Sequence, residues 1–362
     1  MKNGTLGTTG ITVPRAFLGC GTFGGIGGVR DLVGRGLDRK AAFAALDEAL
    51  ALGIDVLDTS ERYAGGESER AIGEWFRQRP RELTKEVRIA TKVAPPTADG
   101  VDGARFNRAY IERKLQTSLD RLGLERVTFY LSHKPDKTTP IEETVEGFAA
   151  VINAGRVGHV GCCNVGAEEL IEALDAAERL GVPGFEWVQN GFSLLSPNED
   201  REVRAVCRER GIGYTPFSPL AGGILTGKYA RGEPFPEGTR MALRPEAHAE
   251  MMTDAVHDRP RSAKGRGGGT FRELRGLGSS MVDCASGLHR PCRWAIARGT
   301  ASGPSRRSTQ FGAGSRGARA DRFMVRGGRR CSRDRFRPKW AVTPTDRNWP
   351  VTGIDAIRLS GR

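Results

Sequence analysis

Short apolar runs alternate with longer amphipathic segments from residue 16 to about residue 220, and this alternation limits the folds open to the chain. The short runs have the length of strands, and the long segments repeat apolar residues at the spacing of a helix face. Strands that alternate with helices predict parallel β-α-β units. Runs that are apolar almost throughout indicate a parallel sheet whose faces are covered by helices.

Seven such units follow one another, and an eighth would close a parallel (β/α)8 barrel of the TIM type. We expect strands at Ala16–Phe23, Val56–Thr59, Val87–Val93, Val127–His133, His159–Asn164, Phe185–Asn190 and Gly213–Phe217. We expect helices at Asp38–Leu52, Glu67–Arg77, Asn107–Leu122, Ile141–Asn153, Ala167–Leu180 and Asp200–Arg210. Before the first unit, Gly4–Pro14 has the pattern of a short hairpin that would plug one end of the barrel.

The glycines of Gly19–Gly24 (GCGTFG) satisfy the spacing of a dinucleotide-binding loop. In such a loop a helix begins at the last glycine, so that its amino end meets the pyrophosphate. Here Gly25–Gly28 (GIGG) follows, and the next helical pattern waits until Asp38. We therefore prefer a barrel strand that runs into a mobile loop over a Rossmann unit.

Charge divides the chain into two parts. The net charge of +13 is typical of nucleic-acid binders, but residues 259–362 hold 24 lysines and arginines against 6 acidic residues, while residues 1–258 hold 32 against 37. Leu, Ile, Val and Phe make up only 15 of the last 104 residues, which at high net charge is typical of disorder. We expect a seven-unit barrel at 1–258, an incomplete eighth unit, and a basic Arg/Gly-rich tail at 259–362.

Two interpretations of this tail stay open. It is a basic segment that binds RNA or another polyanion, or it is the product of a shifted reading frame, because out-of-frame translation of GC-rich DNA is rich in Arg, Gly, Ser, Pro, Ala and Cys. We favour the shifted frame, because the tail begins at the position in the sequence where the eighth unit of the barrel would be expected.

The start of the chain and its cysteines bear on the compartment. Met1–Gly10 is polar, and no apolar run approaches the roughly 18 residues of a membrane span. The seven cysteines are an odd number, so we expect thiols, with Cys162 and Cys163 as small strand residues rather than a redox pair. We expect a soluble, cytoplasmic protein without a membrane partner.

Polar side chains recur at the carboxyl ends of five successive expected strands: Asp58, Lys92, His133, Asn164 and Gln189. Each alone has an ordinary explanation, such as a loop cap or a solvated strand end. In a parallel barrel, however, catalytic groups project from these ends, and polar residues are costly inside apolar strands. Together they indicate an active site.

The residues around these side chains resemble the signature of the aldo-keto reductases, from residue 4 to about residue 245. The matching segments are Asp58–Tyr63 (DTSERY), Gly65–Glu69 (GGESE), Ile89–Lys92, Leu131–Asp136, Gly161–Asn164, Val188–Asn190 and Phe217–Tyr229. The resemblance implies hydride transfer between NAD(P)H and an aldehyde or ketone, without a metal. It implies a small carbonyl or alcohol substrate and a nicotinamide cofactor, NADP(H) before NAD(H).

The resemblance assigns catalysis to Asp58, Tyr63, Lys92 and His133. A carbonyl oxygen that receives hydride needs a proton, and a phenol with a pKa near 10 gives one poorly unless it is tuned. We expect Tyr63 to be the general acid and base and Lys92 to lower its pKa. Asp58 would hold Lys92, and His133 would orient the carbonyl or help to relay the proton.

The resemblance also assigns cofactor contacts to the last three expected strands. Asn164 and Gln189 resemble the amides that clasp the nicotinamide carboxamide, and Phe217 resembles the ring on which nicotinamide stacks. Cys163 stands where many relatives have serine, which weakens one hydrogen bond. The loop that resembles the pyrophosphate cover contributes Ser218, Leu220, Gly222 and Leu225.

A second class of function stays open, namely a non-catalytic regulatory or RNA-binding protein built on a reductase-like barrel with a basic tail, although we do not expect nucleic acid to be the partner. Dinucleotide binding separates the two classes. The phosphate segment that the resemblance leads us to expect has only a faint match, at Gly303–Arg306 with Gln310.

We predict that this chain binds NADPH weakly, because the nicotinamide contacts are present while the phosphate contacts are not. Two or three lost charge-assisted hydrogen bonds, at about 1.5–3 kcal/mol each, weaken binding by about 10²–10⁶-fold. Quenching of Trp187 and the other tryptophans during an NADPH titration measures the affinity. Low-micromolar binding would contradict the prediction and make the tail a working part of the site.

Overall fold

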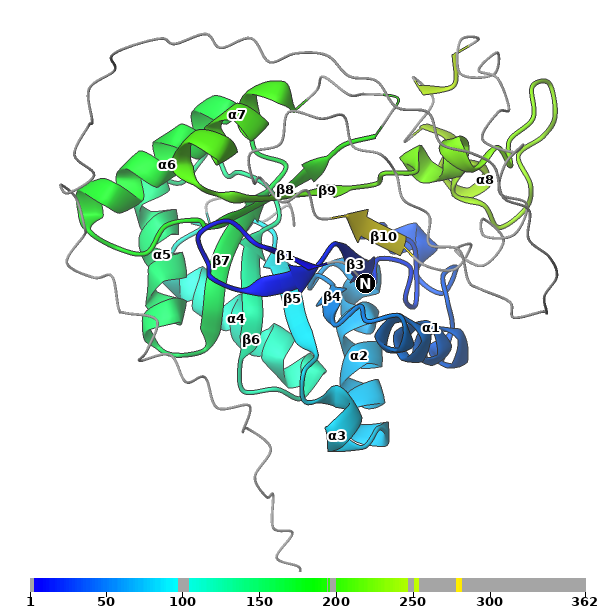
Figure 1. The fold of residues 1–362 in the computed structure, drawn as a ribbon, viewed down its shortest axis with the longest axis horizontal. Coiled ribbons are helices and arrows are strands. Elements are labelled where there is room, and N and C mark those ends of the chain that lie inside the picture. The colour runs from blue at the N-terminus through cyan, green and yellow to red at the C-terminus, as the bar shows by residue number, and fades with distance from the viewer. Residues whose placement is uncertain are drawn as a thin grey trace, which may run out of the picture. The chain divides into compact units, whose positions relative to one another are not determined.

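The protein is described by a computed structural model that covers residues 3–96, 104–193, 195, 200–246 and 251–253 and the backbone of 278–281. Seven parallel strands pair in chain order to form a curled sheet (Figure 1). They are β3 (Ala16–Gly19), β4 (Val56–Asp58), β5 (Arg88–Val93), β6 (Val127–Ser132), β7 (Val157–Cys163), β8 (Trp187–Gly191) and β9 (Gly213–Phe217). This arrangement confirms the parallel α/β class and the seven predicted units.

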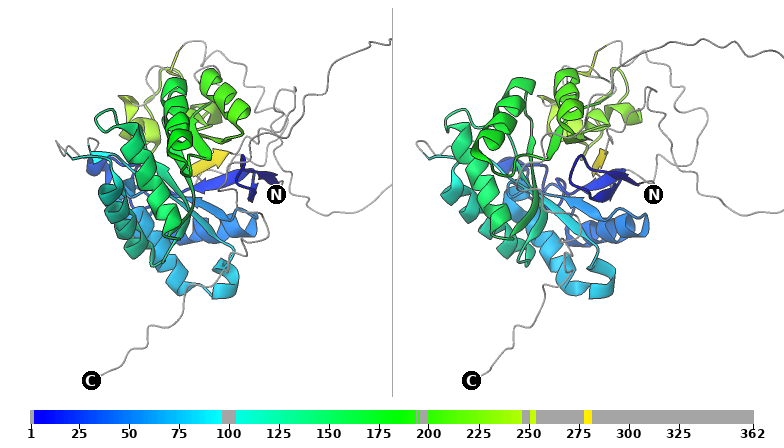
Figure 2. Two further views of the ribbon diagram at one scale, coloured as in Figure 1. Left: turned by 90° about the vertical axis from the view of Figure 1, so that its left-hand side faces the viewer. Right: turned by 60° about the vertical axis from the view of Figure 1, so that its left-hand side comes forward.

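Helices pack on the outer face of this sheet (Figure 1, Figure 2). They are α1 (Arg39–Ala51), α2 (Glu67–Gln78), α3 (Arg81–Thr84), α4 (Arg108–Leu122), α5 (Ile141–Asn153), α6 (Ala167–Leu180) and α7 (Arg201–Arg210). The six predicted helices agree with the structure to within one residue at each end. Their ends carry the expected signals: Asp38 Oδ1 accepts a 2.8 Å hydrogen bond from Ala41 N at the start of α1, and Gly181 ends α6 with a φ of 65°.

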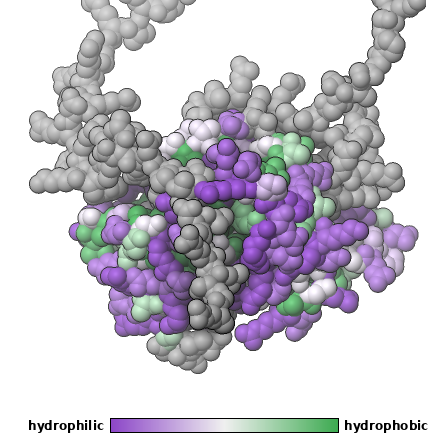
Figure 3. All heavy atoms as spheres, turned by 90° about the horizontal axis from the view of Figure 1, so that it is seen from below, coloured by the Kyte–Doolittle hydropathy of each residue, from purple (hydrophilic) through white to green (hydrophobic). Residues whose placement is uncertain are grey.

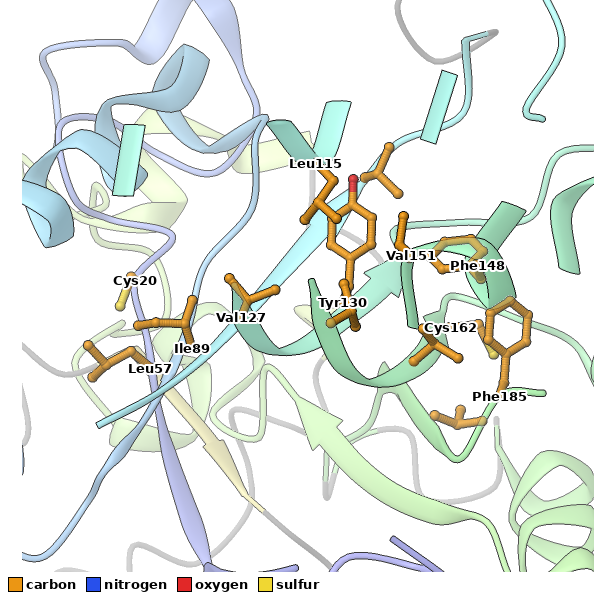
Figure 4. Packing of buried hydrophobic residues seen from close by; sticks show 14 of the residues in the cluster. Cys20, Leu57, Ile89, Leu115, Val127, Tyr130, Phe148, Val151, Cys162 and Phe185 are labelled. Atoms are coloured by element: carbon orange, nitrogen blue, oxygen red, sulfur yellow. The ribbon is translucent and has the colours of Figure 1, made fainter. Parts of the chain in front are cut away.

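Alternate residues of each strand face the inside of the barrel and the helices. Phe129 and Trp187 lie inside, with ring centroids 5.1 Å apart. Leu57, Ile89 and Tyr130 lie on the other face of the same sheet, in the layer between strands and helices (Figure 4). The protein therefore has an inner and an outer apolar core, and the polar residues at the strand ends extend the inner one.

The predicted hairpin is confirmed as β1 (Asn3–Thr5) paired antiparallel with β2 (Thr12–Pro14). It lies at the amino end of the strands, where Arg88 Nη1 donates a 2.7 Å hydrogen bond to the carbonyl of Thr12. Leu6 enters the inner core. Gly7 has a φ of 52° and approaches β9 so closely that a Cβ would lie 2.3 Å from the nitrogen of Gly213, so only glycine fits.

The glycine-rich segment after β3, which the sequence predicts to be a mobile loop, makes several backbone hydrogen bonds. Backbone hydrogen bonds fold it back on itself, from Leu37 N to Thr22 O (2.7 Å) and from Gly34 N to Gly24 O (2.7 Å). A bond of 2.8 Å from Ala64 N to Gly27 O then ties it to the next β-α connection. The strand is correspondingly shorter than predicted, and no helix begins at Gly24, in agreement with the rejection of a Rossmann unit.

The sheet has one further strand, β10 (Gly278–Met281), which pairs with β3 in the antiparallel direction. A TIM barrel closes with a parallel eighth strand, and none occurs in the part of the chain that the structure describes. The eighth unit is thus incomplete there. Apart from the β10 backbone, the predicted tail at 259–362 lies outside the described residues, and so does the faint phosphate match at Gly303–Arg306 and Gln310.

Four cysteines fall within the described residues, and all four are buried free thiols, as predicted: Cys20, Cys162, Cys163 and Cys207. The adjacent pair divides between the two cores, Cys162 in the outer and Cys163 in the inner one. On the face shown in Figure 3, hydrophilic side chains predominate and hydrophobic ones form small separate patches. None of the helices described here has the length and apolar character needed to span a bilayer.

We predict that Trp187→Ala lowers the free energy of unfolding by about 3–5 kcal/mol, because it leaves a cavity in the inner core. The indole is fully buried, and its Nε1 donates a 2.8 Å hydrogen bond to Thr215 Oγ1. Urea unfolding followed by circular dichroism measures the loss. Leu52→Ala, at a side chain that is 47% exposed, is the control and should change stability by less than about 0.5 kcal/mol. A loss below 1 kcal/mol for Trp187→Ala would contradict a packed interior.

Candidate active site

Lys92 is one of the four predicted catalytic residues, and it contacts two of the others, Asp58 and Tyr63. Lys92 Nζ lies 2.7 Å from Asp58 Oδ1 and donates hydrogen bonds to Tyr63 Oη at 3.0 Å and to the carbonyl of Thr59 at 2.9 Å. Asp58 ends β4 opposite Ala90 of β5, so Lys92, two residues farther on, faces the same side of the sheet. Strand register therefore places the carboxylate and the ammonium in contact.

The surroundings of Lys92 keep its side chain positively charged. Only 1% of Lys92 is exposed, and burial lowers the pKa of its ammonium group. Burial is the largest single effect, but the negative charge of Asp58, the hydrogen bond to it and the contribution of Tyr63 raise the pKa by more when taken together. The net pKa of Lys92 therefore lies above the ordinary value for lysine. The site thus has a permanent cation beside the phenol.

Tyr63 lies in the turn that follows β4, in the short 3-10 helix η2 (Tyr63–Gly66). Its ring lies 4.7 Å from Lys92 Nζ, measured to the ring centroid. Burial raises the pKa of the phenol, while Lys92 lowers it, and burial has the larger effect. Lys92 lowers the pKa of Tyr63, as expected, but burial raises it by more, so Tyr63 keeps its proton at neutral pH.

His133 directly follows β6, and its backbone nitrogen donates a 2.7 Å hydrogen bond to Val93 O. Its ring meets that of Tyr63 edge to face, with centroids 5.7 Å apart. Burial lowers the pKa of His133 to about 3, with the positive charges of Lys92, Arg62 and Lys134 acting in the same direction. The imidazole is therefore neutral at physiological pH.

A buried ion pair that sequence reasoning missed holds the segment around Tyr63. Arg121 of α4 donates from Nη1 to Glu69 Oε2 at 3.0 Å and to the carbonyl of Glu61 at 3.1 Å. Glu69 is fully buried and also accepts a 2.6 Å bond from Thr91 Oγ1. Gly66, with a φ of 96°, leaves room for the guanidinium, since a Cβ there would lie 2.4 Å from Arg121 Cζ. The sequence signal was the glutamate within the GGESE segment, but nothing in it points to an arginine 52 residues away.

Asn164 follows β7 and Gln189 lies within the neighbouring strand β8, and the two residues differ in exposure. Asn164 follows β7 at the exposed mouth with a φ of 56°, and its Nδ2 donates a 2.7 Å bond to the carbonyl of His133. Gln189 is only 2% exposed, and its Nε2 donates to Asp58 Oδ2 at 3.3 Å. Its Oε1 lies 3.8 Å from Cys163 Sγ, and burial raises the pKa of that thiol to about 12, so the thiol is neutral. The side chain of Asn164 is therefore accessible to a cofactor, whereas the side chain of Gln189 is covered by the protein.

The remaining predicted cofactor residues follow one another at the end of β9. The ring of Phe217 lies against Gly191 of β8, where a Cβ would be 3.4 Å away. Ser218 (φ 56°) and Gly222 (φ 65°) have left-handed backbones. Leu220 precedes the 3-10 helix η4 (Ala221–Thr226), and Leu225 lies within it. An aromatic ring, an amide at the mouth and a loop of turned backbone fit the nicotinamide end of a dinucleotide.

Comparison with known proteins bears on this site. A sequence model described as the Aldo/keto reductase family matches residues 18–268. The uncharacterized oxidoreductase YrpG of Bacillus subtilis is 36% identical over 247 residues, which are 66% of this chain and 72% of that protein. The NADH-specific methylglyoxal reductase of Escherichia coli is 32% identical over 255 residues, 66% of this chain and 73% of that protein.

Two further relatives extend the comparison. The aldo-keto reductase yakc [NADP(+)] of Schizosaccharomyces pombe is 32% identical over 201 residues, and the match spans 55% of this chain and 58% of that protein. The crystal structure of a thermostable aldo-keto reductase in complex with the inhibitor epalrestat superposes with a TM-score of 0.51 at 26% identity. That superposition covers 61% of this chain and 73% of the other.

We predict that His133 stays neutral from pH 5 to pH 9, which NMR of the ¹⁵N-labelled ring can follow. Its pKa of about 3 lies below the value near 6.5 that we expect in the unfolded chain. The unfolded state therefore binds more protons between these values, and the free energy of unfolding falls as pH drops below about 6.5, by at most about 1.4 kcal/mol per pH unit. His133→Gln should flatten this slope. Titration of His133 near pH 6.5 in the folded protein would contradict the prediction.

Proposed function

Because this chain belongs to the aldo/keto reductase family, we propose that its site transfers a hydride between NAD(P)H and the carbonyl carbon of an aldehyde or ketone, with Tyr63 as general acid and base. The observation that carries the proposal is the buried ammonium of Lys92, held 2.7 Å from a carboxylate and 3.0 Å from a phenol. A nicotinamide dinucleotide supplies or accepts the hydride when it is bound. The residues of this chain manage the proton and the charge.

In the direction of reduction, Tyr63 donates its proton to the carbonyl oxygen as negative charge develops there. The raised pKa of Tyr63 means that the phenol begins the reaction protonated. Lys92 then stabilises the phenolate, and Asp58 balances the charge of the ammonium. In the direction of oxidation, the same phenol accepts the proton of the alcohol.

His133 orients the carbonyl as a neutral hydrogen-bond donor. A ring with a pKa of about 3 is neutral at physiological pH and does not act as an imidazolium acid. Its position beside Tyr63 allows it to hydrogen-bond the same oxygen. This assignment supports one of the two roles that the sequence leaves open for His133.

We assign the nicotinamide end of the cofactor to Asn164, Phe217 and the loop of Ser218, Leu220, Gly222 and Leu225, with Gln189 beneath them. NADP(H) is the first cofactor to test, and one relative is named with NADP(+). NADH is the second, because another relative is named as NADH-specific. Small aldehydes form the first substrate panel, because relatives are named as reductases of methylglyoxal and of L-glyceraldehyde 3-phosphate.

We predict that Tyr63→Phe lowers kcat/KM for carbonyl reduction by about 10²–10⁴-fold, because the general acid is lost. The assay follows NADPH or NADH oxidation at saturating cofactor, so that weak binding does not hide the chemistry. Tyr110→Phe makes the same chemical change on α4, where the hydroxyl donates a 3.3 Å bond to Ala94 O, and should retain activity. Equal activity of Tyr63→Phe and the unmodified chain would disprove the role of Tyr63.

A further inference from the structure

We propose that Ser60 fixes the tautomer of His133, so that Nδ1 accepts a hydrogen bond from the serine and Nε2 carries the proton that faces the substrate. Ser60 is a positioning residue in this scheme, because it acts on the reaction through His133. The catalytic meaning of the tautomer rests on the proposed function, but the tautomer itself can be measured without any substrate.

The contact between the two side chains is short and enclosed. Ser60 lies two residues beyond β4 and is fully buried, and its Oγ is 2.9 Å from His133 Nδ1. A neutral imidazole has one nitrogen that donates and one that accepts a hydrogen bond. The direction of the bond to Ser60 therefore decides which nitrogen is protonated.

The distances around Ser60 favour one direction. Oγ accepts a bond of 3.3 Å from the backbone nitrogen of Arg62. The serine proton could go to His133 Nδ1 at 2.9 Å or to the carbonyl of Lys92 at 3.4 Å. The Lys92 carbonyl already accepts a 3.2 Å bond from the backbone nitrogen of Glu61. Donation to Nδ1 thus uses the shorter contact and leaves the Arg62, Glu61 and Lys92 groups all paired.

Two hydrogen bonds of its backbone fix the position of His133 between β5 and the end of β7. Val93 accepts from its nitrogen and Asn164 donates to its carbonyl, both at 2.7 Å. The Nε2 atom makes no hydrogen bond with the described part of the chain, and the ring stands edge to face with Tyr63. With Nε2 protonated, two donors, from His133 and Tyr63, serve one carbonyl oxygen.

The opposite tautomer would impair the same step. An unprotonated Nε2 would present a lone pair to the carbonyl oxygen, and the two acceptors would repel each other. The His133 ring does not ionise at physiological pH, so a second proton cannot correct the error. No bond of the substrate forms or breaks at Ser60, and the serine keeps its proton throughout.

The test uses the full chain labelled with ¹⁵N-histidine, in long-range proton–nitrogen NMR spectra at pH 7. We expect the His133 signals of an Nε2-protonated ring, with Nδ1 at the position of a hydrogen-bonded acceptor. In Ser60→Ala the Nδ1 signal should move to that of a nitrogen without a donor, and Ser60→Thr, which keeps the hydroxyl, should restore it. A His133 ring protonated at Nδ1 in the unmodified chain would overturn the proposal.

Ser68→Ala is the matched control, since Ser68 is equally buried but bonds to Thr59 Oγ1 (2.8 Å) and Cys20 O (2.9 Å) instead of His133. It should leave the His133 signals in place, and a shift equal to that of Ser60→Ala would show a general disturbance and overturn the proposal. In the reductase assay we expect Ser60→Ala to lower kcat by about 3- to 10-fold, with recovery in Ser60→Thr.

The two hypotheses fail in different ways. Absence of reductase activity in the unmodified chain, together with an Nε2-protonated ring that responds to Ser60→Ala, would contradict the proposed function and support the role of Ser60. Full reductase activity in Ser60→Ala, with unchanged His133 signals, would overturn the role of Ser60 and leave the proposed function standing.

Discussion

The ion pair between Asp58 and Lys92 constrains the structure at the carboxyl ends of the barrel strands. Both side chains are buried, with 3% and 1% exposed, and a buried charge without its partner costs several kcal/mol. Neither strand can therefore shift in register without separating the charges. The pair fixes the ends of β4 and β5, and Lys92 in turn fixes the hydroxyl of Tyr63. One electrostatic requirement thus positions three groups of the site.

The apolar interior nearer the amino ends of the strands supplies the stability that lets polar residues occupy the carboxyl ends. Beneath the ion pair, the inner core is apolar and includes Phe129 and Trp187, and the N-terminal hairpin adds Leu6 to it. Burial of this apolar surface stabilises the fold without any contribution from the site. The polar groups then lie at the open end of the strands, where Arg121 and Glu69 anchor the Tyr63 segment from outside the sheet.

The sequence predicted helices better than strand ends, and the reason is local. The ends of α5 and α6 match the prediction because their sequence signals are local: Pro140 precedes α5, and Gly166 and Gly181 bound α6. The strand at Ala16 was predicted to reach Phe23, yet it stops at Gly19 because the following loop bonds back on itself across more than ten residues. Patterns of apolar residues do not record such a contact.

The same limit applies to the site. The placement of Asp58, Lys92 and His133 at strand ends could be predicted, since the topology alone brings such ends together. The partners Ser60 with His133 and Glu69 with Arg121 are 73 and 52 residues apart, and no periodicity connects them. The net pKa of Tyr63 was also beyond the sequence, because it depends on how deeply the ring is buried.

Four residues other than glycine hold left-handed backbones in the described chain, namely Ala64, Asn164, Ser218 and Ala221, and all four lie in loops that leave the carboxyl ends of the strands. Such conformations are strained for side chains with a Cβ, at about 1 kcal/mol or more each. Glycine would hold these backbones with less strain but would increase the entropy of the unfolded chain. The rim of the barrel is therefore the region where stability and the shape of the opening make opposite demands on the same positions.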